Sequence, residues 1–178
     1  MSMRTRIVAT ATAVLLGAGG LALAPAAAAA APYHGIDGKD AVTDDWQDEE
    51  NLGVDDHTTS NATALWQTVL WADGAQWEDE DGDSHAFGKD QIDGVFGPET
   101  ESATQWWQQN FNLSENDGVV TDQSWRFAQA RLTGPSKTST VTYTGGAQKA
   151  SFKRVGGKYR VRLLGTGTFK NAYYDKVG

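Results

Sequence analysis

Apolar residues recur at helical spacing in three segments of this chain. In the first segment, four apolar residues fall at i, i+3, i+4 and i+7 on one helix face: Ala62, Leu65, Trp66 and Val69. We therefore predict a helix over 61–73. Thr59 or Ser60 precedes it as the N-cap, because a hydroxyl there accepts a hydrogen bond from the unpaired backbone N–H groups of the first turn. Gly74 is expected to end it.

Two further helices are predicted in the middle of the chain. One begins at Pro98, where a missing backbone N–H costs nothing because the first helical turn has unpaired donors. Its apolar stripe consists of Ala103, Trp106, Trp107 and Phe111. The next covers 122–132 with Thr121 as N-cap, and its stripe consists of Trp125, Ala128 and Leu132.

After Gly134 and Pro135 the spacing of apolar residues changes from helical to alternating. The segments 152–155 and 158–163 flank a Gly-Gly pair, which suits the positive φ angles of a tight hairpin turn. In the second arm the apolar side chains (Tyr159, Val161 and Leu163) alternate with basic ones (Lys158, Arg160 and Arg162). With a last strand expected in 168–177, we predict an antiparallel meander of three or four strands.

The first part of the chain has the features of a leader followed by an acidic segment. Arg4 and Arg6 precede an apolar run, and an alanine tract ends at Ala31. A basic start, an apolar stretch and small residues at the exit are typical of a secretory signal peptide, which we place at 1–30. Residues 31–58 are acidic with few apolar positions, and we expect an N-terminal arm or linker there.

The charge is divided sharply along the chain. Residues 32–132 contain 22 acidic and four basic residues, whereas residues 133–178 contain nine basic residues and one acid, Asp175. This asymmetry indicates two regions with different partners. The chain has no cysteine, which excludes disulfides, thiol hydrolases and cysteine-ligated metals.

A short motif occurs twice near the middle of the chain. Residues 92–100 read Ile-Asp-Gly-Val-Phe-Gly-Pro-Glu-Thr, and residues 117–125 read Asp-Gly-Val-Val-Thr-Asp-Gln-Ser-Trp in the same frame. In each frame the Asp can cap a turn and the Gly can adopt an angle that a Cβ would forbid. The residues that carry the motif, which we expect to be mainly structural, are Asp93, Gly94, Phe96, Gly97, Pro98, Thr100, Ala103, Trp107, Gln108, Asp117, Gly118, Ser124 and Trp125.

These frames resemble the small three-helix peptidoglycan-binding domain family of bacterial wall proteins. The resemblance covers about 59–132 and implies a binding module without catalytic residues. The expected fold class is therefore mainly α: a three-helix bundle over 59–133, followed by a basic β-rich appendage over 137–178.

Together with the predicted signal peptide, the resemblance implies that the protein is a secreted, non-catalytic protein that binds peptidoglycan at the cell wall. Aromatic rings stack on the C–H faces of sugars and amides bind their polar edges, so we select four candidate ligand contacts. These are Trp71, Trp77, Trp106 and Gln109. Anionic wall polymers are a further candidate partner for the basic tail, which alternatively pairs with the acidic half of the chain or is a solvated face. No nucleic acid partner and no membrane contact of the mature form are expected.

Two other classes of function stay open. The altered second frame, with Thr121-Asp122 in place of Gly-Pro, and the long acidic segment 74–91 leave room for a protein-interaction or inhibitor module that reuses the scaffold. A small wall hydrolase, or an accessory subunit of one, is the other. We expect no cofactor and no metal site, because the acidic run 78–83 lacks EF-hand spacing and the three histidines show no helical pairing.

Overall fold

The computed structural model describes residues 34–39, 41–135, 140–164 and 166–178. The described residues all belong to one compact unit. The predicted signal peptide at 1–30 lies outside the described residues. None of the helices in the described ranges has the length and hydrophobicity needed to span a bilayer.

Helix α1 (Asn61–Asp73) has the predicted bounds. Ser60 is the N-cap, and its Oγ accepts a hydrogen bond of 2.9 Å from the backbone N–H of Thr63. Gly74 ends the helix in the left-handed conformation (φ 72°). Almost every side chain of α1 is buried, so this helix lies inside the core and is not an amphipathic surface helix.

Helices α2 (Pro98–Asn110) and α3 (Asp122–Gln129) also begin where predicted. Thr121 is the N-cap of α3, although its side chain makes no capping hydrogen bond. The predicted end of α3 at residue 132 is wrong, because Leu132 pairs with Tyr143 in the sheet. The helix therefore stops where the chain turns into the first strand of that sheet.

The larger sheet has five antiparallel strands in sequence order, β3-β4-β5-β6-β7. Their bounds are β3 (Leu132–Thr133), β4 (Val141–Thr144), β5 (Lys149–Val155), β6 (Lys158–Arg162) and β7 (Phe169–Asn171). The predicted hairpin is confirmed: β5 and β6 flank Gly156 (φ 63°) and Gly157 (φ 74°), as a tight turn of this hand requires. The alternation over 158–163 is confirmed as well, since Tyr159, Val161 and Leu163 are buried.

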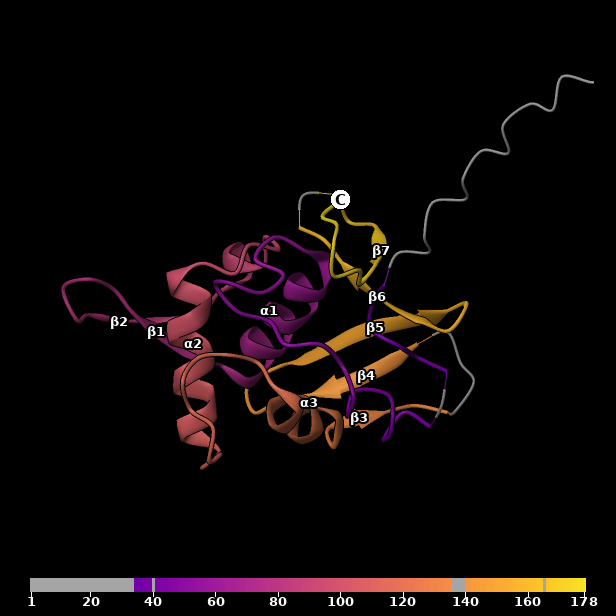
Figure 1. The fold of residues 1–178 in the computed structure, drawn as a ribbon, viewed down its shortest axis with the longest axis horizontal. Helices are drawn as coiled ribbons and strands as arrows, with labels where there is room; N and C mark the ends of the chain where they lie inside the picture. The colour runs from indigo at the N-terminus through magenta and orange to yellow at the C-terminus, as the bar shows by residue number, and fades with distance from the viewer. Residues whose placement is uncertain (1–33, 40, 136–139, 165) are drawn as a thin grey trace, which may run out of the picture. The chain divides into compact units, whose positions relative to one another are not determined.

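A second, two-stranded sheet forms in the acidic segment between α1 and α2. Strands β1 (Gln76–Glu78) and β2 (Ser84–Ala86) make a hairpin, and the 3-10 turn η1 (Lys89–Gln91) follows. The backbone N–H of Glu78 donates to Ser102 Oγ at 2.9 Å, which ties β1 to α2. Figure 1 shows this hairpin extending from α2 on the side away from the five-stranded sheet.

The expected fold class, a mainly α three-helix bundle, is wrong. The described part of the chain is 27% helix and 24% strand, and it contains a five-stranded sheet beside three α-helices. The physical reason is that α1 packs against β4, β5 and β6 as well as against α2, so helices and sheet share one hydrophobic core. Sheet and helices bury each other's apolar faces, as in an α+β fold. Figure 1 shows the helices beside the five-stranded sheet.

Residues 34–58, which were expected to form an acidic arm or linker, contribute to this core. Ile36, Val42, Trp46 and Leu52 are buried. The Trp46 ring packs edge-on against rings from α3, β5 and β6, with centroids 5.6 Å from Trp125, 5.8 Å from Phe152 and 5.3 Å from Tyr159. The segment thus fills the space between α3 and the sheet.

Candidate functional site

The first Asp-Gly frame is held by hydrogen bonds from a glutamine on α1. Gly94 adopts φ 80°, and Asp93 Oδ1 accepts from the backbone N–H of Val95 at 2.8 Å. The Gly94 backbone N–H donates to Gln67 Oε1 at 2.8 Å. Gln67 Nε2 in turn donates to the Val95 carbonyl at 3.0 Å and to Thr100 Oγ1 at 3.1 Å. The buried Gln67 amide therefore connects the first frame to the first turn of α2.

The second frame repeats this arrangement with a glutamine on α2. Asp117 Oδ1 accepts from the backbone N–H of Val119 at 3.0 Å, and Gly118 adopts φ 84°. Gln108 Oε1 accepts from the Gly118 backbone N–H at 3.0 Å. Gln108 Nε2 donates to the Val119 carbonyl at 2.7 Å and to Ser124 Oγ at 3.1 Å. The two frames are thus held by equivalent hydrogen bonds.

Gln67 is the residue of this arrangement that the sequence analysis missed. Gln67 follows Trp66 and Gln108 follows Trp107, so a Trp-Gln pair on a helix precedes each frame. The Trp66 and Trp107 rings are both buried, and they lie nearly perpendicular with their centroids 5.0 Å apart. The repeated Trp-Gln pair is the signal in the sequence that identifies Gln67.

The motif residues divide by burial. Those that lie inside the core or contact it are Gly94, Phe96, Thr100, Ala103, Trp107, Gln108, Gly118, Ser124 and Trp125. Asp93, Pro98 and Asp117 are exposed, and Gly97 is half-buried at the N-cap of α2. The backbone of both frames is also paired with the N-terminal segment, through bridges between Thr59 and Val95 and between Leu52 and Val120.

The four candidate ligand contacts do not form one cluster. Trp106 is half-buried and Gln109 is exposed, both on α2. Trp77 lies on β1, which packs along α2, and its ring stacks on His85 at 4.7 Å. Trp71 lies on α1 and lines a separate cavity.

The cavity beside Trp71 has a volume of about 420 Å³ and lies between α1, η1 and the five-stranded sheet. Its apolar walls include Trp71, Ile92 and Phe169. Its basic lining residues are Lys89, Lys149 and Arg162. The cavity therefore combines aromatic surface with positive charge.

Two other cavities lie near the frames. One of about 220 Å³ is lined by residues of the first frame, among them Asp93, Pro98 and Thr100. The other, of about 720 Å³, lies beside the start of α3, where Ser114 and Gln123 contact each other at 2.7 Å. Both are bounded by the segment that contains the motif.

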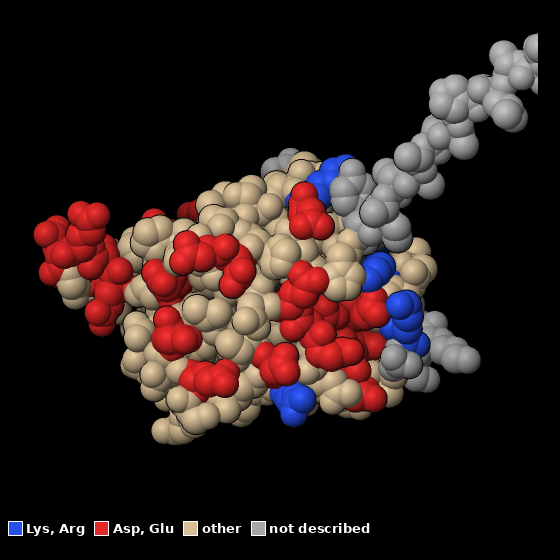
Figure 2. Space-filling view, in the orientation of Figure 1, with Lys and Arg blue, Asp and Glu red and all other residues tan. Residues whose placement is uncertain are grey.

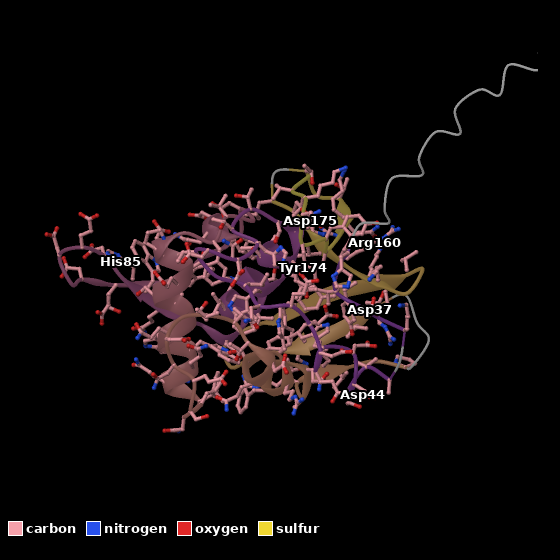
Figure 3. All side chains as sticks on the ribbon, viewed as in Figure 1. Asp37, Asp44, His85, Arg160, Tyr174 and Asp175 are labelled. Carbon is pink, nitrogen blue, oxygen red and sulfur yellow. The ribbon has the colours of Figure 1, made fainter. Side chains whose placement is uncertain are left out.

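One carboxylate of the acidic hairpin β1–β2 accepts hydrogen bonds from within the hairpin. Asp79 accepts hydrogen bonds from His85 Nε2 at 2.8 Å and from the backbone N–H groups of Asp81 and Asp83. The hydrogen bond from His85 is the main reason that the pKa of Asp79 lies below its ordinary value. Figure 2 shows the acidic side chains exposed at the tip of this hairpin, and Figure 3 labels His85 there. Among the described residues no three acidic or histidine side chains are arranged to hold a metal ion.

Part of the basic tail is paired with the acidic N-terminal segment. Arg154 forms a buried ion pair with Asp45 at 3.2 Å, and Lys158 Nζ donates to Asp37 at 2.5 Å. Burial alone would raise the pKa of Asp37, but hydrogen bonds from Lys158 and Lys39 outweigh it and hold this pKa below its ordinary value. These pairs tie β5 and β6 to residues 37–45.

A buried glutamate links the same segment to the end of the chain. Glu49 accepts hydrogen bonds from the Tyr174 hydroxyl at 2.6 Å and from the Asp37 backbone N–H at 2.5 Å. Burial raises the pKa of Glu49 to about 7, against the opposing effect of these two hydrogen bonds. The Glu49 carboxyl therefore takes up a proton near neutral pH.

Comparison with known families gives one match in the region of the frames. Residues 84–127 match the family described as "Putative peptidoglycan binding domain". Comparison with curated proteins and with solved structures gives no significant match. The matched segment runs from β2 to α3 and includes both Asp-Gly frames.

Proposed function

We propose that this protein is a secreted, non-catalytic protein that binds peptidoglycan at the bacterial cell wall. The observation that carries the proposal is the family match over 84–127, which spans both frames with their shared hydrogen-bond arrangement. The proposed secretion rests on the basic, apolar and alanine-rich sequence of residues 1–30.

The proposed ligand surface is the exposed side of α2 together with β1. Trp106 and Gln109 lie within the matched segment and are not fully buried, and Trp77 lies on the neighbouring strand. An indole ring can stack on the C–H face of a sugar while an amide pairs with an N-acetyl or peptide group. These three residues therefore offer the two kinds of contact that a peptidoglycan strand requires.

The test is retention of the full chain on purified peptidoglycan stripped of anionic polymers. We expect the wild type to be retained and W106A/Q109A to bind roughly tenfold more weakly, since a stacking contact and a hydrogen bond are removed. The matched control is T144A/Q148A, which changes two exposed polar residues outside α2 and β1.

Failure of the wild type to bind would favour a scaffold reused for a protein partner and would overturn the proposal. Release of reducing sugar or of free amino groups from the peptidoglycan during the same incubation would overturn the non-catalytic part. Retention that is lost at high salt would attribute the binding to the charge of the basic tail instead of to α2.

A further inference from the structure

The cavity between α1 and the sheet has the size of a small-ligand site. Its volume of about 420 Å³ lies in the range of pockets that enclose small molecules. Trp71 and Phe169 contribute aromatic surface from two elements that are far apart in sequence. Of the described residues that line the cavity, only Lys89 and Ile92 belong to the segment that matches the family.

The basic residues of this cavity are not neutralised by carboxylates of the described ranges. Lys89, Lys149 and Arg162 form no ion pair there, whereas Arg131, Arg154 and Lys158 each pair with an aspartate. None of the described lining residues is acidic. A chain of net charge −8 has thus concentrated unpaired positive charge at one concave site.

Two of these cations lie against the aromatic walls. Lys89 Nζ is 4.6 Å from the centroid of the Trp71 ring, and Arg162 Cζ is 5.1 Å from the centroid of the Phe169 ring. A cation–π contact positions a cation without cancelling its charge. An anionic group that enters the cavity therefore meets pre-positioned donors beside an apolar ring face.

We propose that this cavity binds one sugar unit that carries an anionic group. The carboxylate or phosphate pairs with Lys149, Arg162 and Lys89, and the apolar face of the sugar contacts Trp71 and Phe169. The inference rests on the proposed function for the kind of sugar, an N-acetylated wall sugar. It adds a second site, formed largely by the sheet, to the ligand surface on α2.

Such a sugar has two chemical sources in a cell wall. The lactyl-substituted sugar of peptidoglycan carries a free carboxylate where its stem peptide has been removed, because the peptide is otherwise attached there as an amide. Anionic wall polymers carry phosphate. Three probes that share the N-acetylglucosamine ring separate these sources: the neutral sugar, N-acetylmuramic acid and the phosphate ester of N-acetylglucosamine.

The experiment is a titration of the full chain with each probe, followed by the NMR signals of the indole N–H groups. The Trp71 signal is assigned with W71F. We expect the Trp71 signal to shift with at least one acidic sugar and with roughly tenfold higher affinity than with the neutral sugar, as loss of a charge-assisted hydrogen bond predicts. Preference for the carboxylate or for the phosphate identifies the source.

The variant K149Q/R162Q tests whether the charge is responsible. Both side chains are exposed, so the fold tolerates the change, and we expect the affinity for the acidic sugar to fall roughly tenfold or more. K170Q is the matched control, because Lys170 is exposed on β7 but does not line the cavity. Equal binding of neutral and acidic sugars, or an unchanged affinity in K149Q/R162Q, overturns the proposal.

The result is separable from that of the proposed function. If the protein is retained on peptidoglycan but no acidic sugar shifts the Trp71 signal, the cavity proposal fails and the proposed function stands. If an acidic sugar binds in the cavity but peptidoglycan does not retain the protein, the proposed function fails and the cavity remains an anionic-sugar site.

Discussion

Two glycines with nearly the same backbone conformation differ in what surrounds them. Gly94 has φ 80°, and a Cβ there would lie 2.9 Å from the Ser60 carbonyl oxygen. Gly82, at the tip of the acidic hairpin, has φ 83° with nothing within 4 Å of a Cβ. Alanine substitutions at these two glycines therefore separate two costs in folding free energy: that of a Cβ in the left-handed conformation, and that of steric crowding around the Cβ.

We expect G82A to lower the free energy of unfolding by about 1 kcal/mol, the cost of a Cβ in the left-handed region. G94A should cost more, roughly 3 kcal/mol, because the frame must also move away from α1. Denaturant unfolding monitored by tryptophan fluorescence measures both. Equal losses in the two variants would mean that the close approach of Gly94 to α1 does not contribute.

At the scale of elements, Trp46 tests whether residues 34–58 belong to the cooperative fold. Its side chain is fully buried and its backbone N–H donates to Gln129 Oε1 at 2.9 Å. W46A should therefore lower the free energy of unfolding by about 3–5 kcal/mol, the usual effect of truncating a buried aromatic ring.

The control for W46A is W106A on α2, where the ring is only half-buried and the expected loss is about 1 kcal/mol. Thermal or denaturant unfolding gives the comparison. A stability of W46A equal to that of the wild type would show that this segment is a linker, as its composition suggested.

Elements with local signals were predictable from the sequence. The cap residues Ser60 and Gly74 set the bounds of α1, and the Gly-Gly pair set the β5–β6 turn. The end of α3 was not predictable, because Leu132 pairs with Tyr143 across the sheet and local propensity does not report this pairing.

The packing of residues 34–58 depends on partners far away in the sequence. Its few apolar residues are separated by acids, a composition typical of unpacked chain. Asp45 is buried together with Arg154 and the Tyr159 hydroxyl, which reach it from β5 and β6. For the same reason the cavity beside Trp71 could not be predicted, although Trp71 itself was selected as a candidate contact.

At the scale of the whole molecule, Glu49 makes stability depend on pH. In the native state its pKa is about 7, whereas its ordinary value is 4.5. Between these values the native state keeps a proton that the unfolded chain has lost, so stability falls as pH rises from about 4.5 to about 7. The difference of 2.5 pH units corresponds to roughly 3 kcal/mol.

The variant E49Q is neutral at every pH and retains an oxygen that can accept from Tyr174. We expect the stability of the wild type, relative to E49Q, to decrease by roughly 3 kcal/mol over this interval in denaturant unfolding at a series of pH values. D44N, which changes an exposed carboxylate of the same segment, should follow the wild type. Parallel curves for wild type and E49Q would show that Glu49 titrates at its ordinary pKa.

The pairing of the first described residues with the last ones has a consequence for how the protein is made. The Ile36 backbone N–H donates to the Ala172 carbonyl at 2.9 Å, and that of Tyr174 donates to the His34 carbonyl at 3.0 Å. The core therefore cannot close on a ribosome-bound chain until residues 172–174 have emerged, and closing so long a loop is slow. Until then the chain stays open enough to be threaded through a translocation channel, as the proposed export requires.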